Sequence, residues 1–138
     1  MAKRYRVELI QDELFALCQR VDGLERVIVV SLDGFEVSAY PPVADQEIEP
    51  PLHSPNIAAT AANAIALGEK ALKRLNQGAL ERLIVEGKEG TMIIYPIEKT
   101  DAALVVMVDK SAKMGLVSLV MRQSIGQLVP ILDRKFSD

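Results

Sequence analysis

Few side chains in this sequence could carry out acid–base or nucleophilic chemistry. His53 is the only histidine and Cys18 the only cysteine among 138 residues. His53 precedes Ser54, but a serine–histidine nucleophile needs a base that a third group orients, and neighbours in a loop rarely reach that geometry. We interpret His53 as an exposed loop residue and Cys18 as a buried or half-buried packing residue. The sequence predicts no catalytic residue.

Two other patterns resemble ligand-binding loops but lack required positions. In the run 87–91, Gly-Lys-Glu-Gly-Thr, Glu89 stands where a phosphate loop needs its magnesium-binding hydroxyl. This run is better interpreted as a polar hairpin turn. Asp45, Glu47 and Glu49 alternate like calcium ligands, but no loop glycine or closing glutamate has the required spacing. We interpret them as a solvated loop and predict no metal and no cofactor.

The composition favours a protein that acts through its surfaces. The chain is 49% apolar and 25% charged, with a net charge of −3 and a pI near 5.2. An acidic balance argues against nucleic acid as a partner, because phosphate recognition needs a basic footprint. A lone cysteine excludes an internal disulfide and a thiolate zinc cluster. We predict one domain over 1–138 and no small-molecule substrate. Because catalytic groups and a metal pattern are lacking, we also predict that the protein is not an enzyme.

One segment is apolar enough to need separate treatment. Met114–Leu132 contains Arg122 as its only charge, and its length approaches that of a membrane span. Ser118, Arg122 and Gly126 recur four residues apart, so a helix here has a small, polar face. We predict an amphipathic helix packed on a sheet, without membrane insertion. The basic start of the chain is soon followed by acidic residues, unlike an export signal, and we expect a cytoplasmic protein.

The first third of the chain predicts a helix and a hairpin. Apolar residues at spacings of three and four from Val7 to Val21 make one helical stripe. Residues 27–30 form a β-branched run typical of a buried strand. A tight turn at 33–34, Asp-Gly, leads into a strand in which Phe35, Val37 and Ala39 alternate with polar residues. We expect these three side chains on the covered face and the polar ones in water.

The rest of the chain predicts a central helix, three strands and a last helix. Five of the seven prolines lie in 41–55, which reads as an exposed loop. A helix then begins with Ser54 as cap and stops at Gly78. Strands are expected at 80–86, 91–97 and 102–108, the last in the middle of the sheet. The last helix has the apolar stripe Met114, Val117, Met121, Ile125, Leu128 and Leu132. The order is helix-strand-strand-helix-strand-strand-strand-helix, an α/β chain of the α+β sandwich type.

The central helix and the strand after it suggest an interface between two copies. Alanines occupy nearly all faces of the helix over two turns, so either it packs tightly on its own sheet or it has a second packing partner. The strand at 80–86 has one edge that its hairpin neighbour cannot pair, which invites another chain. We predict a homodimer, with Gly68 at its axis, and expect a second close backbone approach at Gly115. The predicted interface is Ala58, Ala61, Ala62, Ile65, Gly68, Leu72, Arg82 and Ile84.

Several short motifs, in order and spacing, resemble one family. They are Gly23-Leu24, the hairpin Ser31-Leu32-Asp33-Gly34-Phe35-Glu36-Val37, Asn63-Ala64 in the central helix, and Asp109-Lys110-Ser111-Ala112-Lys113-Met114-Gly115-Leu116. Together they resemble the roadblock family, named for a dynein light chain. The likeness is strongest to bacterial members that regulate a Ras-like GTPase in cell polarity and gliding.

This resemblance implies both a fold and a function. It implies a profilin-like, five-stranded antiparallel sheet with two helices on one face and the central helix on the other. It also implies dimers joined through the third strand and central helix, and binding to a small Ras-like GTPase whose own switch residues are repositioned. The alternative is a non-catalytic structural adaptor or scaffold subunit. Candidate partner-binding residues are Asn56, Asn63, Lys70, Lys73 and Arg74.

Overall fold

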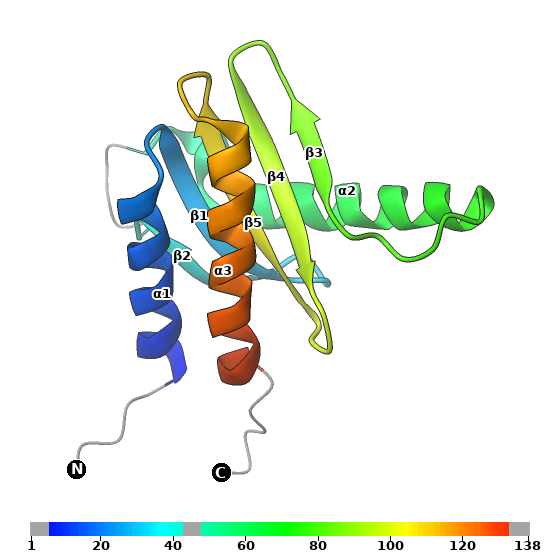
Figure 1. Cartoon of the computed structure of the whole chain (residues 1–138), viewed down its shortest axis with the longest axis horizontal. Coiled ribbons are helices and arrows are strands. Elements are labelled where there is room, and N and C mark those ends of the chain that lie inside the picture. Colours follow the sequence, from blue (N-terminus) through cyan, green and yellow to red (C-terminus); the bar gives the residue numbers. More distant parts are fainter. Residues whose placement is uncertain (1–5, 43–47, 133–138) are drawn as a thin grey trace.

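The computed structural model describes residues 6–42 and 48–132, and there the predicted order of helices and strands is confirmed (Figure 1). A short 3-10 helix, η1, is the one added element, and Asp45 and Glu47 of the predicted loop lie outside the described residues. The elements are α1 (Arg6–Arg20), β1 (Leu24–Ser31), β2 (Glu36–Tyr40), η1 (Pro50–Leu52), α2 (Ser54–Arg74), β3 (Leu83–Glu86), β4 (Gly90–Ile97), β5 (Ala102–Asp109) and α3 (Met114–Leu132).

The five strands form one antiparallel sheet in the order β2-β1-β5-β4-β3. β5 lies in the middle, as its unbroken apolar run predicts, and residues 103–106 are fully buried. β2 and β3 are the two edges. β3 is shorter than predicted, because residues 80–82 lead into the strand without pairing.

Helices cover both faces of the sheet, as expected for an α+β sandwich. α1 and α3 lie together on one face, where Leu14 and Met121 join the apolar side chains of the strands. α2 crosses the other face, and Ile57 and Ala61 pack there on Ile28. The arrangement of sheet and helices in the sequence-based prediction is therefore confirmed.

The predicted facing is wrong for Phe35, Val37 and Ser38, whereas Ala39 is buried and Glu36 exposed as predicted. Phe35 is 70% exposed and Val37 is also exposed, whereas Ser38 is buried. The register skips at Val37, because Val29 opposes Ser38 but Val30 opposes Glu36, and this β-bulge breaks the alternation. The Gln11 side-chain amide donates to the Ser38 hydroxyl at 2.6 Å, which satisfies the buried polar group.

The start of α2 is held by a buried arginine that the sequence analysis missed. Arg26 lies in β1 with 1% of its surface exposed and donates hydrogen bonds to the carbonyl oxygens of Leu52 (2.5 Å) and Pro41 (2.8 Å) and to the Ser54 hydroxyl (2.9 Å). The N-cap residue is His53, so the predicted cap at Ser54 is wrong by one position. Arg26 thereby ties both ends of the proline-rich segment to the sheet.

The end of α2 also differs from the prediction. The helix ends at Arg74, and Asn76 takes the left-handed conformation with φ of 55°. The Gln77 N–H donates to the Leu72 carbonyl at 2.9 Å, which completes a Schellman motif with Asn76 as the turning residue. Gly78, the predicted stop, lies two residues further on.

Among the described residues, α3 is the one helix long and apolar enough to cross a membrane. Its inner side, including Val117 and Leu128, packs in the core with α1 and the sheet, as predicted for an amphipathic helix. A core helix of a folded protein passes the same test of length and composition. Nothing lies within 4 Å of where a side chain at Gly115 would begin, so the expected close approach there is wrong.

Candidate interaction surface

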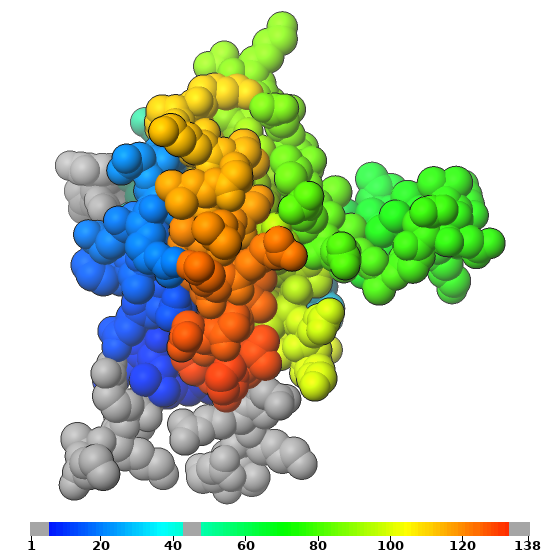
Figure 2. All heavy atoms as spheres, in the orientation of Figure 1, coloured from blue at the N-terminus to red at the C-terminus, as the bar shows by residue number. Residues whose placement is uncertain are grey.

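The second half of α2 extends beyond the edge of the sheet. Its first half buries Ile57, Ala58, Ala61 and Ile65 against the strands. Past that point the helix projects sideways beyond β3 as a separate lobe (Figures 1 and 2). Leu67 is 70% exposed on this lobe. A projecting helix with large exposed apolar side chains is typical of a protein interface.

The projecting half carries an apolar stripe that the sequence analysis did not single out. At 100° per residue, Ala64, Leu67, Ala71 and Leu75 lie along one side of α2. Leu67, Ala71 and Leu75 are exposed, and Ala64 is half-buried. Their spacing of three and four residues was the available signal, but the alanines on every other side concealed it.

The two edge strands of the sheet, β2 and β3, differ in their contacts with the rest of the chain. In the described part of the chain β3 pairs only with β4, and Ile84 (43% exposed) and Val85 are uncovered. At the other edge, the Gln11 amide of α1 donates to the Ala39 carbonyl of β2 at 2.8 Å, which occupies an acceptor of that strand. β3 is therefore an edge strand without a partner on one side in the described part of the chain, as predicted.

The predicted interface residues divide into three groups. Ala58, Ala61 and Ile65 are buried against their own sheet, so the prediction that they face a second copy is wrong. Ala62, Gly68 and Leu72 are half-buried, whereas Arg82 and Ile84 are exposed on and beside β3. Alanine is small enough to pack on the chain's own sheet or on a second copy. The sequence alone therefore could not distinguish the buried alanines from those at the surface.

Gly68 lies close to Leu80 and Leu83 of its own chain. A side chain there would begin 3.5 Å from Leu80 Cδ1 and 4.0 Å from Leu83 Cδ1, the residues that lead into β3. These distances are ordinary van der Waals contacts, so Gly68 faces the connection to β3 with room for a methyl group. The prediction that Gly68 lies at a dimer axis stays a prediction, because these contacts within one chain do not test it.

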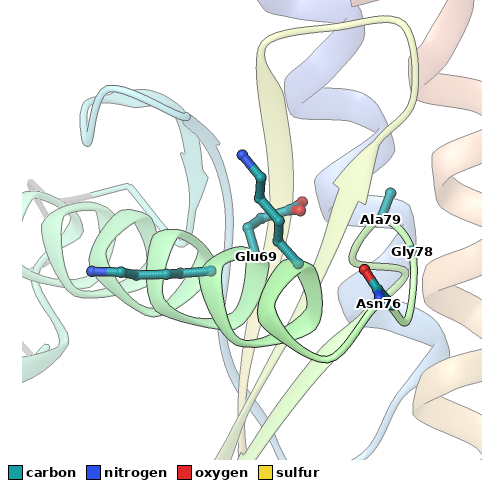
Figure 3. A pocket seen from close by; sticks show the side chains of 6 residues that line it. Glu69, Asn76, Gly78 and Ala79 are labelled. Atoms are coloured by element: carbon teal, nitrogen blue, oxygen red, sulfur yellow. The ribbon is translucent and has the colours of Figure 1, made fainter.

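The predicted partner-binding residues are all exposed. Asn56, Asn63 and Lys70 recur every seven residues and share the face of α2 that points away from the sheet, with Arg74 one turn beyond Lys70. Lys73 lies on a neighbouring side of the helix. A hollow of about 550 Å³ lies between the end of α2 and the turn after it (Figure 3). It is lined by Glu69, Lys70, Lys73, Asn76, Gly78 and Ala79.

The groups considered for chemistry occupy structural positions. His53 is half-buried, so its interpretation as an exposed residue is wrong, and its Nε2 lies 3.0 Å from the Ile48 carbonyl oxygen. Burial raises the pKa of the Cys18 thiol to about 11, against a smaller lowering by the Arg26 charge. The Gly87 N–H donates to the Gly90 carbonyl at 2.8 Å and closes a hairpin turn. Residues 6–42 and 48–132 contain no cluster of three metal-ligating side chains.

Two further polar contacts shape the surface near β3 and before α3. The Arg82 guanidinium donates to the Tyr95 hydroxyl at 3.2 Å, and this hydrogen bond raises the pKa of Arg82. Asp109 accepts from the N–H and hydroxyl of Ser111, which lowers the pKa of Asp109. Asp109 opens the turn that carried part of the sequence resemblance.

A five-stranded antiparallel sheet between a helix pair and a single crossing helix defines a profilin-like α+β protein, and its prominent surface feature is an open edge beside a projecting helix. The chain belongs to the Roadblock/LC7 domain family, because the sequence model of that family matches residues 10–107.

Solved structures have the same fold at low sequence identity. MglB of Myxococcus xanthus is 18% identical, with a TM-score of 0.80, over 100% of this chain and 99% of that one. An MglB with a tetrameric arrangement is 16% identical, with a TM-score of 0.82, over 96% and 94%. Profilin II of Acanthamoeba castellanii is 14% identical, with a TM-score of 0.54, over 91% and 98%. No curated protein sequence matches the chain significantly.

Proposed function

We propose that this chain acts as a homodimer that binds a small Ras-like GTPase and modulates its nucleotide cycle, without a catalytic residue of its own. The proposal is based on one observation. An open edge at β3 and an apolar stripe on the projecting half of α2 occur together on the same side of the molecule. Membership of the Roadblock/LC7 family and the fold shared with MglB support it.

The geometry of α2 gives this dimer a register. Gly68 lies beside the residues that lead into β3. A second β3 paired antiparallel would lie about 4.8 Å away, so a two-fold axis falls at half that distance. With a rise of about 1.5 Å per residue, α2 meets that axis one to two residues beyond Gly68.

The apolar stripe points to the same axis independently. Two antiparallel copies of α2 centred between residues 69 and 70 bring Leu67 of one copy within one residue, about 1.5 Å along the helix axis, of the level of Ala71 of the other. The same register sets Leu75 against Ala64. A large side chain then meets a small one at each position, which is the condition for close helix packing.

The GTPase-binding part of the proposal rests on the family and on the exposed polar face of α2. In the dimer two such faces lie side by side, with Lys70 and Arg74 of both copies near the axis. A regulator of this kind stabilises one arrangement of the GTPase's own catalytic groups, so it needs differential affinity for two states of its partner and no nucleophile or base. A cytoplasmic location remains part of this proposal.

A turnover assay tests the proposal. GTP hydrolysis by the cognate Ras-like GTPase is measured with increasing amounts of this protein, and we expect the rate to change and then saturate. A flat rate despite binding would instead support the structural adaptor. In the double variant Lys73→Glu/Arg74→Glu we expect at least about tenfold weaker binding to the GTPase. Lys88→Glu at the β3–β4 turn is the matched control, and equal affinity of both variants would remove Lys73 and Arg74 from the site.

A further inference from the structure

The hairpin between β1 and β2 presents a second apolar surface, away from the β3 edge. Leu32 and Phe35 at its turn are exposed, and Val37 follows them on β2. The turn lies against α2, because a side chain at Gly34 would begin 3.7 Å from Ala62 Cβ and 3.8 Å from Ala59 Cα. The exposed phenyl group therefore borders the central helix rather than standing alone in solvent.

A hollow of about 310 Å³ lies beside this phenyl group. Gly34, Phe35 and Glu36 line it from the hairpin, and Pro55 lines it from the first turn of α2. Its size is at the lower end of the range for ligand pockets, so it accommodates about one or two side chains. Together with Ala59, these residues define what we call the hairpin groove.

The charged side chains of the hairpin on either side of Phe35 are acidic, whereas the adjoining β4–β5 turn carries Lys99 as well as Asp101. Asp33 and Glu36 flank Phe35 and are exposed, and neither forms an ion pair within the described residues. The Leu32 N–H donates to the carbonyl of Asp101, which brings a third exposed acid to the same end of the sheet. An apolar anchor within an acidic rim is complementary to an apolar side chain flanked by lysine or arginine.

The hairpin groove is compatible with the proposed dimer. Pro55, Ala59 and Ala62 lie on one side of α2, and the stripe containing Leu67 and Ala71 lies on the opposite side by helical periodicity. Pairing through β3 therefore leaves the groove open.

We propose that the hairpin groove docks a short segment of a partner protein in which an apolar side chain, placed in the hollow beside Phe35, is flanked by basic residues. Phe35 is the anchor of this contact, since desolvated aromatic side chains dominate binding at protein interfaces. Asp33 and Glu36 supply the charge selectivity. The site is separate from β3 and from the lysines at the end of α2.

The test uses the full chain and a synthetic peptide in which lysine and leucine alternate around one phenylalanine. Binding is followed by amide chemical shifts of the isotopically labelled protein. We expect the perturbed amides to be those of residues 34–37 and 56–62. We also expect affinity to fall at least about tenfold with Phe35→Ser or Glu36→Lys. The matched controls, Leu119→Ser on α3 and Glu89→Lys at the β3–β4 turn, should change affinity less than about twofold.

Three results would overturn the proposal. These are perturbed amides elsewhere, equal losses with Phe35→Ser and Leu119→Ser, or equal binding of a peptide whose lysines are replaced by glutamate. The solution mass of the Phe35→Ser protein is measured alongside and should equal that of the wild type. Failure of the peptide test with an unchanged mass therefore counts against the hairpin groove and leaves the dimer unaffected.

Discussion

Arg26 is the residue whose environment departs furthest from what its type suggests. Its guanidinium is buried under the proline-rich segment and bonds to Leu52, Pro41 and Ser54. Arg26→Met keeps the apolar stem but leaves these acceptors without their donor, so we expect a loss of about 2–4 kcal/mol in the free energy of unfolding. Urea unfolding at one fixed protein concentration measures this loss.

The control for that experiment is Arg122→Met, which removes an exposed guanidinium from α3. We expect its effect to stay within about 0.5 kcal/mol. Equal shifts for the two variants would show that the hydrogen bonds of Arg26 contribute nothing specific.

Cys18 should be nearly inert as a thiol. Because burial raises its pKa to about 11, the folded protein favours the neutral thiol, and this contribution to stability is present below pH 9 and lost as the pH rises towards 11. We expect labelling by an aromatic disulfide reagent at pH 8 to be at least about tenfold slower in the folded protein than in urea. Equal rates would show that the thiol is neither desolvated nor protected.

At the scale of single elements, two glycines should respond in opposite directions to alanine. Gly68→Ala adds a methyl group in ordinary contact with Leu80 inside a helix, so we expect a gain of about 0.5–1 kcal/mol. At Gly23 the φ of 84° and a contact of 2.6 Å with Asp109 Oδ1 make the added group strained. Thermal unfolding of Gly23→Ala should show a lower midpoint, and a shift of the same sign in both variants would contradict this reading.

The strands and helices were predictable from sequence where one physical requirement dominated. The apolar run of β5 requires cover on both faces, so its central place followed. The facing of β2 could not be predicted, because the bulge at Val37 and the Gln11–Ser38 contact both depend on the neighbouring elements. The predicted end of α2 was also wrong, because Asn76 and Gly78 can each adopt the left-handed conformation that ends a helix.

At the scale of the whole molecule, the open edge was predictable but most of the surface was not. A strand after a crossover with one hairpin neighbour leaves an edge free, which sequence order alone indicates. Which alanines lie on the sheet depends on the direction of α2, so Ala58 and Ala61 were misplaced while Leu67, Ala71 and Leu75 were overlooked. Phe35 was assigned to the core because the bulge in β2 was not foreseen.

The proposed dimer should be sensitive to one side of α2. Leu67→Asp places a carboxylate near the level of Ala71 of a second copy in this register, so we expect dissociation of the dimer at micromolar concentration. Leu119→Asp is the matched control, because Leu119 is a comparably exposed leucine on α3. Circular dichroism of both variants checks that each is folded. A folded Leu67→Asp protein that remains dimeric would exclude the α2 register.

The central claim is that two copies of this chain join at β3 and α2. The most direct test is the solution mass of the unmodified protein, measured by light scattering over a range of concentrations. The account predicts a mass near twice the 15.1 kDa of the chain. A mass that stays at 15.1 kDa across the range would contradict it, because the apolar side chains of the projecting half of α2 would then remain in water.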